Sequence, residues 1–149
     1  MEGIGRNIEK TTEELLNELE TAENLDGFFE ENQDELLKMG LSEYLNLLLK
    51  KYGLDKKAVF SRARMNDSNY GYEIFKNDRK HPSRDKLIRL CIGFPLTVDE
   101  TEKALVIAKL RPLYPRDMRD ACILFALHRG YDVDQVNDLL FEKGEKTLE

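Results

Sequence analysis

The chain has 149 residues, of which 35% are charged, and a formal net charge of −6. This length allows one globular domain with a hydrophobic core, but not two large ones. No run reaches the roughly 20 apolar residues of a membrane-spanning helix, and the N-terminus lacks the apolar segment of a secretory signal. We therefore expect a cytoplasmic protein, with Cys91 and Cys122 as core residues because both lie in apolar runs.

The charge is unevenly distributed along the chain. Residues 1–40 carry 3 basic and 12 acidic side chains, a net charge of −9. Residues 41–89 carry 12 basic and 6 acidic side chains, a net charge of +6, and residues 90–149 carry 8 and 11, a net charge of −3. A surface that binds nucleic acid needs local positive charge rather than a basic chain, so the basic island at 41–89 is the place to look for one.

The N-terminal segment is predicted to be helical and acidic. Thr11 and Glu14 have the spacing of a capping box, in which each side chain binds the other residue's backbone N–H. Two helices are predicted here, over roughly 12–22 and from Asn24 or Asp26 to near Gly40. We expect residues 1–40 to be an acidic appendage that covers part of the core, engages a basic protein partner or lies over the basic island.

Four short helices are predicted in the middle of the chain. The first has apolar residues at the i, i+3, i+4, i+7 spacing of an amphipathic helix, from Leu41 to Tyr52, and ends at Gly53. Asp55 is placed to cap the second, and Pro82 and Ser83 to begin the fourth. The third is expected to begin at Asn66 or Asp67 and to end near Asn77.

Three more helices are predicted after residue 96. Thr97 and Glu100 form a second capping box, and we expect Pro112 to end that helix. Pro115 is expected in the first turn of the next helix, which contains the run ACILFAL and is apolar nearly all round. Such a helix is usually buried, either at the centre of the domain or in a dimer interface. The last helix begins at Asp132 and carries Val133, Val136, Leu139 and Leu140.

Residues 41–94 resemble the DNA-binding domain of the Cro/CI-like (XRE, phage-repressor-type) helix-turn-helix family. The segments that carry the resemblance are LSEYLNLLLKKYGL, DKKAVFSRA, SNYGYEIF and NDRKHPSRDKLIRL. It implies an all-α compact helical bundle that contains a repressor-like helix-turn-helix over 41–96. The acidic appendage would precede this unit, and residues 97–149 would form a C-terminal helical extension that could serve as a dimerisation element.

The resemblance also implies a set of DNA contacts. In such a unit the second helix of the pair enters the major groove, polar residues read base edges and basic residues neutralise phosphates. The residues at the corresponding positions are Lys56, Ser68, Asn69, Tyr72, Lys76, Arg79 and Lys80.

This sequence departs from the family pattern at the turn. Phe60 stands where the family usually has a small residue, and Arg64 stands where it usually has Gly. A residue other than Gly with positive φ costs about 1 kcal/mol or more. A bulky Phe60 would push the two helices apart unless the next helix makes room, and we expect Gly71 to provide that room.

These patterns leave three hypotheses. The first is a homodimeric transcriptional regulator that binds double-stranded DNA, with the ACILFAL helix and the last helix as the dimer contact. The second is a protein-interaction module that keeps the repressor-like fold, such as an antitoxin, a phage or host-defence accessory factor, or an adaptor. The third concerns regulation, with the acidic helices of residues 10–38 competing with DNA for the basic island. We expect neither enzymatic activity nor a metal or other cofactor, because no catalytic or ligand motif is present.

Overall fold

The described part of the chain is entirely helical. The computed structural model describes residues 11–23, 25, 27, 31, 39–65, 68–76 and 80–149. Eight helices are assigned within these residues, and none of these residues forms a strand. They are α1 (Thr12–Thr21), α4 (Leu41–Tyr52), α5 (Lys56–Arg62), α6 (Ser68–Lys76), α7 (Arg84–Gly93), α8 (Val98–Ile107), α9 (Met118–Arg129) and α10 (Val133–Glu142). The predicted all-α fold is therefore confirmed.

The helix starts follow the predicted caps. The Thr11 and Thr97 hydroxyls and the Asp55 carboxylate each accept a hydrogen bond from the backbone N–H three residues on. The Ser83 hydroxyl and the Asp132 carboxylate do the same for α7 and α10. Capping of this kind is local, so sequence spacing is enough to predict it. The predicted caps Asn66 and Asp67, and most of the helix expected to follow Asn24, lie outside the described residues.

Two predicted boundaries near the prolines are wrong. Helix α8 ends at Ile107 rather than at Pro112, because Lys109 adopts a left-handed conformation with φ 60° and the Leu110 N–H bonds back to the Leu105 carbonyl. Pro115 lies before α9 rather than within its first turn. It follows Tyr114 in a turn closed by the Asp117 N–H, and Asp117 then caps α9.

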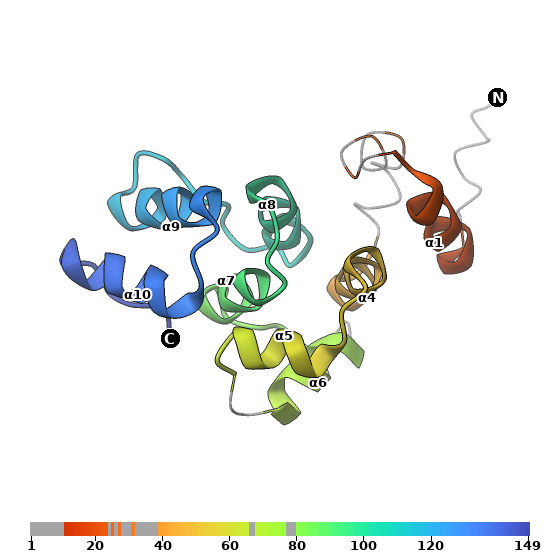
Figure 1. Cartoon of the computed structure of the whole chain (residues 1–149), viewed down its shortest axis with the longest axis horizontal. Helices are drawn as coiled ribbons and strands as arrows, with labels where there is room; N and C mark the ends of the chain where they lie inside the picture. The colour runs from red at the N-terminus through yellow and green to blue at the C-terminus, as the bar shows by residue number, and fades with distance from the viewer. Residues whose placement is uncertain are drawn as a thin grey trace.

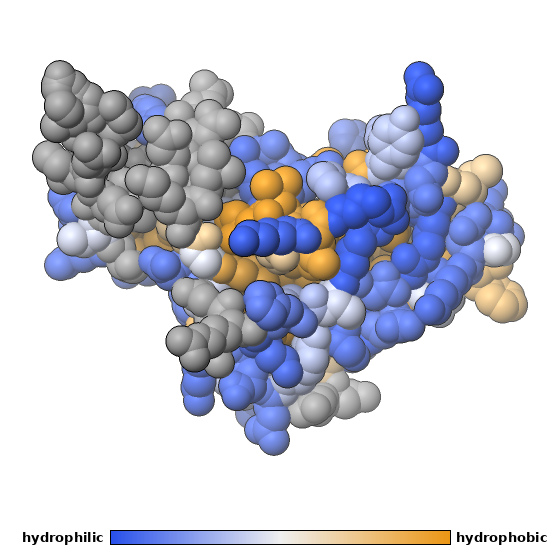
Figure 2. Space-filling view, turned by 180° about the vertical axis from the view of Figure 1, so that it is seen from behind, coloured by the Kyte–Doolittle hydropathy of each residue, from blue (hydrophilic) through white to orange (hydrophobic). Residues whose placement is uncertain are grey.

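The helices are arranged with α7 and α8 in the middle of the molecule (Figure 1). Helices α9 and α10 lie on one side of this pair and α4 on the other, with α1 beyond α4. Helices α5 and α6 form a separate end, where α6 packs on α4 and α5 packs on α7. On the opposite face, apolar atoms gather in the middle and hydrophilic side chains surround them (Figure 2).

One hydrophobic core connects the described helices. It runs from Leu19 of α1 to Leu148 near the C-terminus and includes both free cysteines, as predicted. Helix α8 packs on α4 and α7, so the core is continuous across residue 96. The predicted boundaries of 1–40, 41–96 and 97–149 stay a prediction. None of the helices in the described part of the chain has the length and apolar character needed to cross a membrane.

A buried polar cluster joins α4 to α8 within this core. The Glu100 side chain is buried, and its carboxylate accepts the Tyr52 hydroxyl proton, with the hydroxyl oxygen 2.6 and 2.8 Å from the two carboxylate oxygens. The Tyr44 hydroxyl donates to the Glu100 carbonyl at 3.1 Å, and burial raises the pKa of Tyr44 well above its usual value. A buried carboxylate is tolerated only when such donors satisfy it, so these bonds fix the crossing of α4 and α8.

The ACILFAL helix is buried on one side only. Cys122, Ile123, Ala126 and Leu127 are buried, but the Phe125 side chain is 43% exposed. Of the two positions expected for this helix, the centre of the domain does not fit the exposed Phe125, and the dimer interface stays a prediction. Helix α9 packs on α8 and α10 at the edge of the molecule, and its outward side has no neighbour among the described helices.

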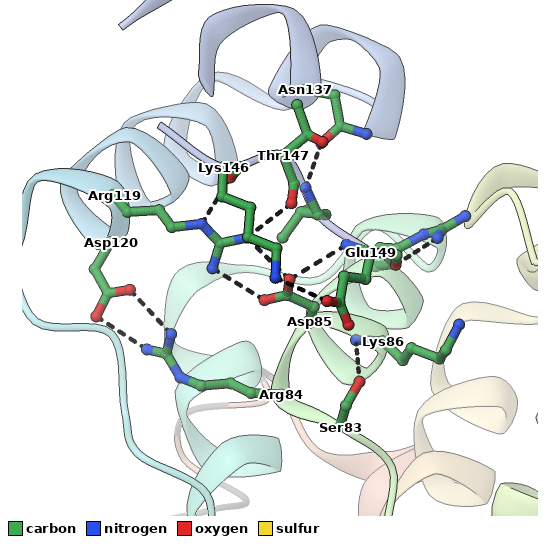
Figure 3. Close-up of polar contacts among 12 residues, drawn as sticks. Ser83, Arg84, Asp85, Lys86, Arg119, Asp120, Asn137, Lys146, Thr147 and Glu149 are labelled. Carbon is green, nitrogen blue, oxygen red and sulfur yellow. Dashed lines mark hydrogen bonds and ion pairs between the residues drawn. The ribbon is translucent and has the colours of Figure 1, made fainter. Parts of the chain in front are cut away.

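Two ion-pair networks hold the C-terminal region to α7 (Figure 3). Arg119 of α9 donates to both oxygens of Asp85, at 3.0 and 2.9 Å, and also to the Lys146 and Thr147 carbonyls. The Asp120 carboxylate is buried and accepts from the Arg84 guanidinium at 3.0 and 2.9 Å. It also accepts from Arg111 and from the Tyr114 N–H.

Both carboxyls have a lowered pKa. Burial alone would raise the pKa of Asp120, but hydrogen bonds from Arg84 and the Tyr114 N–H outweigh it and lower the pKa. For Asp85 burial also raises the pKa, and the bonds from Arg119 and the Glu149 N–H reverse the effect. A lowered folded-state pKa means that each carboxylate stabilises the fold above its unfolded-state pKa of about 3.9 and loses that contribution as the pH falls through the folded-state value.

We therefore expect the free energy of unfolding to fall in acid, and D85N and D120N to reduce that fall. Removing one partner of a buried pair costs about 3 kcal/mol, so D120N should be less stable than the wild type at neutral pH by roughly that amount. Between about pH 6 and about pH 3, both variants should lose less stability than the wild type. Urea unfolding followed by circular dichroism measures both quantities.

The matched control is D99N. Asp99 forms an exposed pair with Lys103 at 3.7 Å, so its substitution should change the free energy of unfolding by no more than about 0.5 kcal/mol. An acid response of D120N identical to that of the wild type would show that Asp120 is not the group that titrates.

Candidate nucleic-acid interface

The turn between α5 and α6 is built around a left-handed residue. Arg64 has φ 57°, the conformation that a glycine would adopt most easily. The Met65 N–H bonds to the Phe60 carbonyl at 3.0 Å and closes the end of α5. Arg64 thus has positive φ at the position where the family that the sequence resembles usually has a glycine.

The Arg64 side chain connects this turn to α10. Its guanidinium donates to both oxygens of Asp134, at 3.4 and 2.8 Å. Both side chains are more than half exposed, and the bond from Arg64 lowers the pKa of Asp134. A glycine could not make this contact, so the arginine links the turn to the C-terminal helices.

A second arginine, Arg89 of α7, binds the backbone of the same turn. Its Nε donates to the Ala63 carbonyl at 3.1 Å, and its two other nitrogens donate to the carbonyls of Arg64 and Glu149. One planar guanidinium therefore satisfies carbonyls from two distant segments. Sequence reasoning missed this residue, because Arg89 and Ala63 are 26 positions apart and no local pattern relates them.

Phe60 and Gly71 set the distance between α5 and α6. Phe60 is 4% exposed, and a Cβ added to Gly71 would lie 2.5 Å from Cε1 of the Phe60 ring. The ring also meets Tyr72 and Phe75 edge to face, with centroids at 5.0 and 5.7 Å. The expectation that Gly71 makes room for Phe60 is confirmed, because no larger residue fits at this position without moving a packed ring.

The predicted contact residues occupy the start and the end of α6. Ser68 is the first residue of α6, and Asn69 is exposed in its first turn. Lys76 is exposed in its last turn. Tyr72 is half-buried, because its ring packs against Phe60, and only part of it faces solvent.

Lys56 lies next to this surface. It is the first residue of α5, and its ammonium lies 6.0 Å from the centroid of the Tyr72 ring and 5.5 Å from that of Phe75. A cation within about 6 Å of an aromatic face is attracted by the ring. The structure thus brings Lys56 and Tyr72 together, as one surface beside α6.

A second group of cations lies around the Tyr70 ring. The ammonium of Lys80 lies 4.6 Å from the centroid of the Tyr70 ring, and that of Lys86 lies 5.4 Å from it. The Tyr70 hydroxyl accepts from the N–H of Ser83, the residue that caps α7. Sequence reasoning included Lys80 but missed Lys86. The only feature of the sequence that pointed to Lys86 was its position within the basic island at 41–89. Arg79 lies outside the described residues.

The surface is not uniformly basic. Glu73 is exposed on α6, between the two groups of cations in sequence. Among the residues that the structure describes, no group of three or more His, Cys, Asp or Glu side chains is placed to hold a metal ion. The polar groups that this surface presents are ammonium groups, aromatic rings and the amide of Asn69.

Comparison of the chain with models of known families, with curated proteins and with solved structures gives no match to any of them.

We expect G71A to destabilise the protein by about 1–2 kcal/mol, because the added methyl group overlaps the Phe60 ring. In an unconstrained helix the same change stabilises by up to about 1 kcal/mol, so the sign of the effect tests the contact. In an F60L background, G71A should cost less or become stabilising. Chemical unfolding of the wild type, the two single variants and the double variant gives this coupling.

E73A on the exposed side of the same helix is the control, and it should stay within about 0.5 kcal/mol of the wild type. If G71A destabilises the F60L background as much as it destabilises the wild type, the Phe60 ring does not set the spacing of the two helices.

Proposed function

We propose that the chain binds double-stranded DNA through α5 and α6 and acts as a transcriptional regulator of the Cro/CI-like type. The observation that carries the proposal is the position of the cations around α6. Lys76 lies at its end, Lys56 lies beside Tyr72, and Lys80 and Lys86 share the Tyr70 ring. A cytoplasmic location fits this role and the two free, buried cysteines.

The contacts divide into two kinds. Ser68 and Asn69, at the start of α6, are the proposed base-reading residues, since the first turn of a recognition helix lies closest to the base edges. Tyr72 contributes the exposed part of its ring. The lysines, together with Arg79, are proposed to neutralise phosphates, which fixes position and orientation without reading sequence.

The ionic-strength dependence of binding tests the proposal. Binding of a mixed duplex pool, followed by fluorescence anisotropy, should weaken steeply with salt, because each neutralised phosphate contributes a slope of about −0.9 in log K against log[salt]. K76A, K80A and K86A should each lower the affinity and reduce the slope by about 1. N69A should alter sequence preference with little change in slope.

K109A is the control, because Lys109 is exposed at the end of α8 rather than beside α6. It should bind as the wild type does. Absence of binding at low salt to every duplex in a genomic pool would overturn the proposal.

A protein-interaction module is the second candidate. Two observations favour it: the packing of Tyr72 against Phe60, which removes part of a predicted base contact, and the exposed Glu73 on the same helix. Helix α1 supplies an acidic surface as well, and its Glu20 pairs with Lys50 of α4 at 3.1 Å. Co-purification with a single protein, unaffected by K76A and K80A, would favour this candidate over DNA binding.

The competition between the acidic N-terminal helices and DNA also stays a proposal. In the described residues α1 packs on α4, which belongs to the basic island in sequence. Removal of residues 1–38 would tighten DNA binding if the segment competes with DNA.

A further inference from the structure

The outward side of α9 carries apolar and basic side chains together. Met118 is 64% exposed and Phe125 is 43% exposed, and their spacing of seven residues places them on the same side of the helix. The Arg129 guanidinium lies 4.6 Å from the centroid of the Phe125 ring. Tyr131 meets the same ring edge to face at 6.1 Å. This outward side, defined by Met118, Phe125 and Arg129, is called the α9 strip.

The outward side of α10 carries an aromatic residue among acidic ones. Phe141 is 79% exposed, the largest exposed fraction among the large hydrophobic side chains of the described residues. Asp138 lies one turn before it and Glu142 follows it, and both are exposed. The structure gives neither carboxylate an ion pair with another described residue. Asp138, Phe141 and Glu142 are called the α10 strip.

The two strips complement each other but do not meet within one chain. Helices α9 and α10 pack together, and the buried residues of each, such as Ile123 and Val136, lie on the other side of the helix from its strip. Helices α9 and α10 lie together at one end of the molecule (Figure 1), and the side chains of both strips are exposed there. Burying exposed Phe and Met side chains is favourable, and opposite charges around them would select the partner.

We propose that α9 of one copy packs against α10 of a second copy in a two-fold symmetric dimer. Two-fold symmetry forms the same contact twice, since each copy supplies one basic and one acidic strip. Phe125 and Met118 would lie against the partner subunit's Phe141, and Arg129 would lie near the partner subunit's Asp138 and the partner subunit's Glu142.

A second copy fits this surface better than other partners do. Nucleic acid would be repelled by the carboxylates of Asp138 and Glu142. A protein partner with charge of one sign would match only one of the two strips. A second copy of this chain matches both at once, and the inference does not depend on DNA binding.

The oligomeric state of the full chain tests the inference without DNA. Sedimentation equilibrium over a concentration series should give a monomer–dimer equilibrium. F141D and R129E should each weaken the dimer by about tenfold or more. F141D removes the apolar contact, and R129E places like charges together. The double reversal R129E/D138K should bind itself more tightly than R129E does, because both contacts then regain opposite charges.

V106D is the matched control, because Val106 is a comparably exposed apolar residue on α8, and it should dimerise as the wild type does. Phe141 is largely exposed, so F141D should keep the circular dichroism spectrum and melting temperature of the wild type. A monomer at every concentration, growth beyond a dimer, or a dimer indifferent to F141D and R129E would each overturn the inference. Any of these outcomes would leave the proposed DNA binding unaffected.

Discussion

The close approach of Phe60 to Gly71 is the constraint on which the α5–α6 unit depends. A buried aromatic ring occupies the space that a side chain at position 71 would need, so the distance between the two helices is set jointly by the Phe60 ring and by the glycine that it packs against. The same ring supports Tyr72, and through Tyr72 it supports the position of Lys56. The proposed interface therefore rests on packing beneath it, and the surface residues are placed by core residues.

A second set of constraints acts on the turn itself. Arg64 adopts a conformation that a glycine would reach without strain, while its side chain binds Asp134 and Arg89 binds the adjoining carbonyls. Arginine is suited to both roles, because its planar guanidinium can donate several hydrogen bonds in fixed directions. The left-handed turn is thus contacted by long-range partners from α7 and α10.

The features that could be predicted from the sequence are those that depend on neighbouring residues. Helix caps such as Thr97 with Glu100 follow from spacing alone, whereas the positive φ at Arg64 is suggested only by the resemblance to a family that usually has Gly there. The end of α8 differs from the prediction because Lys109, not a proline, takes the left-handed conformation. The exposure of Phe125 depends on what packs around α9, which an apolar run cannot reveal. Arg89 and Lys86 join the site through tertiary contacts between distant residues, which no local sequence pattern predicts.

The link between Arg64 and Asp134 also bears on how the chain folds. The two residues are 70 positions apart, and the clamp of Arg89 on Ala63 spans 26. Helical proteins usually fold fast because most of their contacts are local. Here the α5–α6 turn is closed locally by the Met65 N–H and by the packing of Phe60 on α6, but its contacts with Asp134 and Arg89 form only after distant segments have come together. The short helices and the packing of Phe60 between them can form early, whereas the attachment of the turn to α7 and α10 is expected to be among the last features of the native state to be established.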